Sequence, residues 1–92
     1  MVRFEWDEDK RISNLKSHGI DFKDIYRVFD YDRFLLQDDR YDYGETRWVS
    51  FGLLFGEVVA VTHTETDVVI RIISVRKADK HEEKRYFKSI RD

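Results

Sequence analysis

Arginines in the second half of the chain are the residues best suited to chemistry on a phosphate. Arg47 opens an alternating run, while Arg71 and Arg76 lie within and at the end of a β-branched run. A guanidinium binds two phosphate oxygens at once and keeps its charge. Such an arginine can instead snorkel or pair with an acid of the loop. In a regular strand Arg71 and Arg76 point to opposite sides, unless a bulge intervenes.

Other side chains could transfer protons or hold RNA. His63, at a strand end, is a candidate acid or base near neutral pH, or a structural histidine. Lys10 and Arg11 could line a phosphate groove or form a solvated helix face, and Lys10 could also assist proton transfer. Tyr86, near the basic end, could stack on a base, assist proton transfer or anchor a protein interface.

Charge is unevenly distributed along the 92 residues. The formal net charge is −2, but residues 30–45 carry six acids against two bases, and residues 71–92 carry eight bases against four acids. A basic end can meet RNA phosphates or an acidic protein, or it can be a solvated helix face. The charge pattern therefore suits both a nuclease and a non-catalytic RNA- or protein-binding module.

Composition disfavours several classes of site. The absence of cysteine removes disulfides, thiolate metal ligands and cysteine nucleophiles. The three histidines are scattered without metal-ligand spacing, and there is no glycine-rich phosphate loop, so we expect neither a metal nor a cofactor. No apolar run approaches the roughly 18 residues of a membrane span, and the N-terminus does not resemble a signal peptide. We therefore expect a cytoplasmic protein with no membrane partner.

The sequence predicts one α+β domain over residues 1–92 to position these candidates. Asp7 and Asp21 can cap two helices after a short first strand, and Gly19 can end the first helix. Asp79 and Glu82 form a possible capping box for a C-terminal helix. The expected strands are 2–6, 34–37, 47–53, 57–64 and 68–75, of which the last three form an antiparallel meander.

Apolar spacing indicates which helix faces pack on the sheet. The second helix gives the strongest signal, because four large apolar residues fall at i, i+3, i+4 and i+7: Phe22, Ile25, Tyr26 and Phe29. The first helix has a narrower stripe of Ile12 and Leu15. The apolar residues of the last helix are Tyr86, Phe87 and Ile90.

An ordered set of residues along nearly the whole chain resembles the BrnT family, the toxin halves of bacterial type II toxin–antitoxin pairs. The resemblance begins with Phe4-Glu5-Trp6-Asp7, Lys10, Asn14, Lys16, His18 and Gly19. It continues through Phe22, Val28-Phe29, Asp42-Tyr43-Gly44-Glu45, Arg47, Gly52 and Thr64-Glu65. It ends with Arg71-Ile72-Ile73-Ser74, Arg76, Lys77-Ala78, Glu83 and Arg85-Tyr86. Two features depart from the family pattern: Val75 stands where a small residue is common, and the loop between Phe29 and Arg40 is unusually acidic.

The resemblance implies a RelE-like fold, with an antiparallel sheet, two N-terminal helices and one C-terminal helix. It also implies a ribonuclease that arrests translation and growth until neutralised by a BrnA-type ribbon-helix-helix antitoxin. Operator DNA would be bound only through the antitoxin, and the repressed form would be a heterotetramer.

The chemistry expected is metal-independent attack by the RNA 2′-OH. Arg47, Arg71 and Arg76 would stabilise charge, and His63, Tyr86 or Lys10 would assist proton transfer. The alternative function is a non-catalytic co-repressor subunit that binds RNA or protein.

Overall fold

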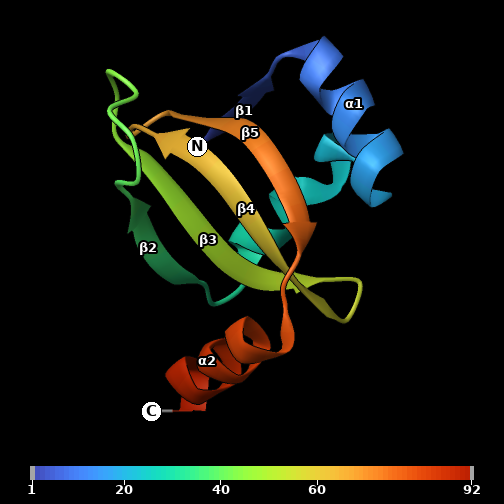
Figure 1. Ribbon diagram of the computed structural model, residues 1–92, viewed down its shortest axis with the longest axis vertical. Coiled ribbons are helices and arrows are strands. Elements are labelled where there is room, and N and C mark those ends of the chain that lie inside the picture. The colour runs from blue at the N-terminus through green and yellow to red at the C-terminus, as the bar shows by residue number, and fades with distance from the viewer. Residues whose placement is uncertain (1, 92) are drawn as a thin grey trace.

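The secondary-structure elements follow the predicted order along the chain (Figure 1). The structure is a computed structural model that describes residues 2–91. Its elements are β1 (Arg3–Trp6), α1 (Glu8–His18), the 3₁₀ helix η1 (Phe22–Asp30), β2 (Phe34–Asp38), β3 (Arg47–Leu54), β4 (Glu57–Glu65), β5 (Val69–Lys77) and α2 (Lys80–Arg91). The α+β class is confirmed, with five strands and three helices among the described residues.

The strands form one sheet in the order β1-β5-β4-β3-β2. Strands β2 to β5 pair antiparallel, which confirms the meander. β1 instead pairs in parallel with β5, with Phe4 opposite Ile70, so the sheet is mixed and the expectation of a wholly antiparallel sheet is corrected at this edge. The alternation in residues 2–6 specifies which side chains face the core, such as Phe4 against Phe29, but not the direction of a distant partner strand.

The predicted helix caps are all present. Asp7 accepts hydrogen bonds from two backbone N–H groups of the first turn of α1, at 2.9 and 3.1 Å. Gly19 ends α1 with a φ of 70°, a left-handed conformation that suits glycine. Asp21 accepts a backbone N–H at 3.0 Å at the start of η1. Asp79 and Glu82 form the reciprocal capping box of α2, at 2.8 and 3.0 Å.

Helix α1 is joined to the sheet by a polar residue. Ile12 and Leu15, its expected apolar stripe, remain 41% and 39% exposed. Asn14 is buried instead, donating to the carbonyl of Ile20 at 3.2 Å and accepting from the backbone N–H of Val75 at 3.0 Å. The Asn14 side chain therefore links α1 both to the residues just before η1 and to β5, because it satisfies one buried backbone group in each of these segments.

The second helix is a 3₁₀ helix with a three-residue repeat. Its buried residues are Phe22, Ile25 and Val28. Tyr26, which the α-helical spacing placed in the core, is 43% exposed, while Phe29 is partly buried. A 3₁₀ helix has three residues per turn, so its buried face recurs every third position rather than at alternating threes and fours.

Two apolar clusters lie on opposite faces of the sheet. The larger cluster contains the buried residues of η1 together with Ile20, Leu54, Val59, Val61, Ile72 and Val75. On the other face, Tyr86 of α2 packs on Phe51, Val58 and Ala60. Helix α2 lies at one end of the sheet in Figure 1, so it covers only part of this second face. None of the helices in residues 2–91 is long and apolar enough to cross a membrane.

Candidate functional site

A bulge in β5 brings Arg71 and Arg76 to the same face of the sheet. Thr64 pairs with Arg71 and Ala60 with Arg76, but the register shifts between Thr62 and His63, where β5 contains one extra residue. Paired residues share a face, and Thr64, Thr62 and Ala60 alternate regularly along β4. A regular strand would point Arg71 and Arg76 to opposite faces, whereas the bulge places both on the same face.

Arg47 lies on this same face. Phe51 of β3 pairs with Ala60, so the side chains of β3 that share a side with Phe51, including Arg47, project from the face that carries Arg71 and Arg76. Asp38 of β2 lies opposite Arg47 in the register of β2 and β3, so its side chain is on the same face. We call this surface the arginine face. Helix α2 packs on one end of this same face, where the side chains are apolar. The rest of the face is open and carries the polar side chains.

A groove of about 330 Å³ runs over the open part of the arginine face. Its floor is formed by side chains of the sheet, and one wall by the start of α2 and the other by the end of β2. The lining residues are Leu36, Gln37, Asp38, Asp39, Arg40, Val49, Phe51, Ala60, Thr62, Ser74, Arg76 and Glu82. Hydroxyl, amide, guanidinium and carboxylate groups line a shallow hollow, which suits a polar ligand.

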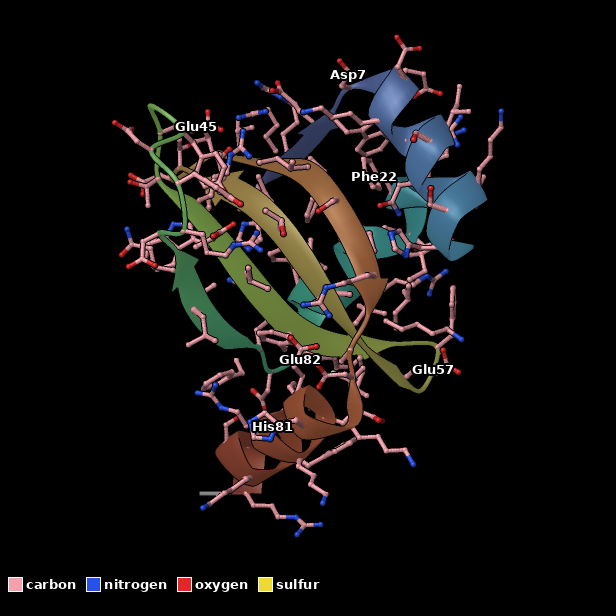
Figure 2. All side chains as sticks on the ribbon, in the orientation of Figure 1. Asp7, Phe22, Glu45, Glu57, His81 and Glu82 are labelled. Carbon is pink, nitrogen blue, oxygen red and sulfur yellow. The ribbon has the colours of Figure 1, made fainter. Side chains whose placement is uncertain are left out.

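Glu45 joins Arg47 to Arg71 beside this groove. Its carboxylate accepts from Arg47 Nε at 2.9 Å and from Arg71 Nη2 at 2.7 Å. The hydrogen bonds from Arg47 and then Arg71 hold the pKa of Glu45 below its ordinary value. A carboxylate thus occupies the position between two guanidinium groups where a phosphate would be bound. Figure 2 shows Glu45 at the end of the sheet opposite α2, within the loop that joins β2 to β3.

Glu82 pairs with Arg76 at the other end of the groove (Figure 2). Arg76 donates two parallel hydrogen bonds to Glu82, at 2.7 and 2.9 Å. The pairing lowers the pKa of Glu82 and raises that of Arg76, while the nearby charge of Arg40 opposes the charge on Arg76. Both arginines that line the groove are therefore paired with carboxylates, Arg76 with Glu82 and Arg40 with Asp38.

The arginine pairs are exposed enough for a ligand to replace their carboxylates. The side chains of Arg47, Arg71 and Arg76 are 22%, 37% and 47% exposed. Ion pairs in contact with solvent contribute little to stability because water screens them. The pairs of Arg47 and Arg71 with Glu45 therefore contribute little to the stability of the fold.

His63 lies on the opposite face of the sheet from the three arginines. It is fully buried, its Nε2 is 2.7 Å from Ser50 Oγ, and its ring packs edge-on against Phe29. Burial lowers the pKa of His63 to about 4, against a raising effect of Glu65. Arg33 donates to both Ser50 and Glu65, which closes this buried network. A neutral, enclosed imidazole is typical of a structural role.

Of the three residues expected to bind RNA, Lys10 and Arg11 lie apart from the arginine face, and Tyr86 is buried against its covered end. Lys10 and Arg11 lie on α1, where Arg11 pairs with Glu8 and Asp21. Tyr86 is 1% exposed, and its hydroxyl donates to the carbonyl of Asp32 at 3.0 Å. Tyr86 therefore serves as the centre of the second apolar cluster, with no free ring face for a base.

The ion pair between an arginine and an acid of the loop, given above as the alternative to phosphate binding, is present, because Glu45 binds both Arg47 and Arg71. Sequence reasoning missed two other groups of this face: Glu82, expected only as a cap, binds Arg76, and Arg40 lines the groove. The pattern Asp38-x-Arg40 beside Arg47 was an available signal, because alternate residues at a strand end return to the same side.

The comparison with known families agrees with the resemblance found in the sequence. Residues 6–82 match the family model described as ribonuclease toxin, BrnT, of type II toxin-antitoxin system. A search of the curated proteins finds no match. The match spans well over half of the 92 residues, from the end of β1 to the first turn of α2, and it includes every residue of the arginine face described above. The chain therefore belongs to the BrnT family of ribonuclease toxins, which act in type II systems together with an antitoxin.

Proposed function

We propose that the protein is a metal-independent endoribonuclease that cleaves RNA on its arginine face. The observation that carries the proposal is the bulge in β5, which adds Arg71 and Arg76 to the face that holds Arg47. Three guanidinium groups then lie on one open surface, Arg47 and Arg71 sharing Glu45 at one end and Arg76 binding Glu82 at the other, and each carboxylate resembles a phosphate edge in shape and charge.

The reaction is an internal transesterification. The RNA 2′-oxygen attacks the adjacent phosphorus, the bond to the 5′-oxygen of the next nucleotide breaks, and a 2′,3′-cyclic phosphate forms. One proton leaves the 2′-OH and one reaches the departing 5′-oxygen. Arg47, Arg71 and Arg76 stabilise the added negative charge on the phosphate oxygens, where fixed donors have their largest effect.

The carboxylates released by the arginines are the proton acceptors that this face offers. While Glu45 binds Arg47 and Arg71 its pKa is lowered, and it is a weak base. Once the guanidinium groups turn to the phosphate, the cause of that lowering is removed and Glu45 becomes more basic. Glu82 changes in the same way when Arg76 binds phosphate. Neither His63 nor Tyr86 enters this scheme, because both are buried away from the open groove.

The test compares single arginine variants purified from the toxin–antitoxin complex. Arg47→Ala, Arg71→Ala and Arg76→Ala should each lower the rate of RNA cleavage by about 10²-fold. Arg→Lys variants should retain part of the activity, because the charge remains and the planar fork is lost. Arg27→Ala is the matched control, since Arg27 is an exposed arginine of η1, which packs on the opposite face of the sheet.

The outcome separates an enzyme from a non-catalytic module. Wild-type protein should cleave RNA in excess chelator and leave the 2′-deoxy analogue intact, because the analogue has no nucleophile. If all three variants cleave RNA at the wild-type rate while melting normally, the arginine mechanism is wrong. RNA that is bound but never cleaved by the wild type would favour the co-repressor alternative.

The family resemblance supports finer proposals about the partner. We infer that cleavage arrests translation and growth, and that a BrnA-type ribbon-helix-helix antitoxin neutralises the toxin and supplies the contacts to operator DNA. The complex is a heterotetramer of two toxins and two antitoxins. Light scattering of the co-expressed pair tests this composition, and a mass that corresponds to one copy of each would contradict it.

A further inference from the structure

The loop between β2 and β3 holds two tyrosines at the edge of the arginine face. Asp38, which is buried, accepts from Arg40 Nε and Nη2 at 2.9 and 3.1 Å and from the Tyr43 hydroxyl at 3.2 Å. Asp42 accepts from the backbone N–H of Gly44 at 3.0 Å and so closes the turn. The loop is therefore folded by its own hydrogen bonds, and Tyr43 is held in a fixed orientation.

The two tyrosines are in contact with Arg47 of the arginine face and Arg40 of the groove. The guanidinium of Arg47 lies 4.0 Å from the centre of the Tyr43 ring while its Nε binds Glu45. The Tyr41 ring meets Tyr43 edge-on, with centroids 5.8 Å apart, and Arg40 lies 6.0 Å from the Tyr41 ring. Tyr41 itself is 70% exposed. An aromatic surface thus continues directly from the cations that we assign to phosphate binding.

We propose that Tyr41, supported by Tyr43, stacks on the unpaired base of a nucleotide whose phosphate is bound by the arginines. This inference rests on the proposed function and adds a base-binding subsite to it. Bases in single strands stack on exposed aromatic rings, and neighbouring cations strengthen the contact. A base in a duplex is covered on both faces, so Tyr41 selects single-stranded RNA.

The neighbouring charges favour RNA over a protein at this position. An aromatic anchor for a protein partner is usually enclosed in an apolar patch. Tyr41 has Arg40 beside it, and the ring of its neighbour Tyr43 lies against Arg47. These cations suit a polyanion with flat bases, and Asp38 fixes the position of Arg40 by pairing with it.

The experiment measures binding of a 2′-O-methyl RNA of mixed sequence, which has no free 2′-OH and is not cleaved. Tyr41→Ala should weaken binding of the single strand about tenfold, equivalent to ~1.4 kcal/mol. Tyr41→Phe should bind within twofold of wild type, because it keeps the ring. The matched control is Tyr31→Ala, since Tyr31 is 67% exposed but lies beside Leu53 and Ile90 and outside the arginine groove. The same oligonucleotide as a duplex should bind more weakly, with no further loss in Tyr41→Ala.

The arginine variants separate failure of the subsite from failure of the proposed function. If Arg76→Ala weakens binding while Tyr41→Ala binds the single strand as wild type does, the subsite is overturned and the phosphate site stands. If neither variant changes binding, both are overturned. Should Tyr41→Ala leave RNA binding unchanged and weaken antitoxin binding instead, the tyrosine is a protein contact and the subsite is wrong. Circular dichroism melts of each variant confirm that the fold is intact.

Discussion

The buried histidine makes the stability of this protein depend on pH. Ser50 Oγ accepts a hydrogen bond from Arg33 at 2.9 Å and lies 2.7 Å from His63 Nε2. The other ring nitrogen of His63, Nδ1, is buried without a hydrogen-bond partner and lies 3.6 Å from Glu65. Protonating the neutral ring would place a charge in this buried site, and the loss of solvation lowers the pKa of His63 to about 4 despite the opposing effect of Glu65.

The sign and size of the effect follow from that pKa. The unfolded chain takes up the His63 proton near pH 6.5, whereas the folded chain takes it up only near pH 4. Unfolded molecules therefore bind more protons between these values, and the free energy of unfolding decreases as the pH falls. Each pKa unit corresponds to 1.36 kcal/mol, so the loss should be about 2 kcal/mol at pH 5 and about 3 kcal/mol at pH 4.

Urea denaturation of wild type and His63→Gln between pH 7.5 and 4.5 measures this loss. The variant lacks the titrating group, so its curve should fall less steeply, although it starts from a lower stability because the packing around residue 63 is altered. Carboxylates that titrate at the lower end are common to both proteins and cancel in the difference. His18→Gln, which changes an exposed histidine at the end of α1, should follow the wild-type curve. A constant difference between wild type and His63→Gln across the whole range would refute the reasoning.

Further predictions concern the fold and the arginine face. Asn14→Ala should cost about 2–3 kcal/mol in thermal or urea unfolding, because it leaves the buried carbonyl of Ile20 and the N–H of Val75 without partners. Gly52→Ala should cost about 1–3 kcal/mol, because the new Cβ would lie 2.6 Å from Val28 Cγ1. Binding of single-stranded RNA should weaken with salt, with a log–log slope of about −2 to −3 for three or four phosphate contacts; a slope near zero would contradict arginine–phosphate binding.

Local signals in the sequence were sufficient for most elements and for every cap. The three strands of the meander were predicted because alternation and short turns are local features, and the same holds for Asp7, Gly19 and the Asp79–Glu82 box. The parallel pairing of β1 depends on contacts with β5 that are distant in sequence, so no short pattern specifies it. The form of η1 also escaped prediction, because Phe22 and Ile25 fit both a three-residue and a 3.6-residue repeat, and only the exposure of Tyr26 distinguishes them.

The candidate site shows the same division between local and distant information. Arg47, Arg71 and Arg76 were selected by residue type, but their common face depends on one extra residue in β5 that shifts the pairing with β4. His63 was expected to transfer protons because of its residue type. In the folded chain it is buried in contact with Ser50, which the sequence pattern does not reveal. Pairing with an acid of the loop was foreseen, but the choice of Glu45 was not, because the loop that contains Glu45 contacts β5 only in the folded chain.

The bulge at the centre of β5 separates the two tasks of the sheet. On one side of the bulge, Ile72 belongs to the core beneath η1, and on the other Val75 returns to that same core. Without the extra residue, Ile72 and Val75 would point to opposite faces of the strand, and so would Arg71 and Arg76. The bulge thus lets one strand supply a continuous apolar face to the core and two arginines to the opposite face. A single local irregularity satisfies both the packing of the fold and the chemistry proposed for the open groove.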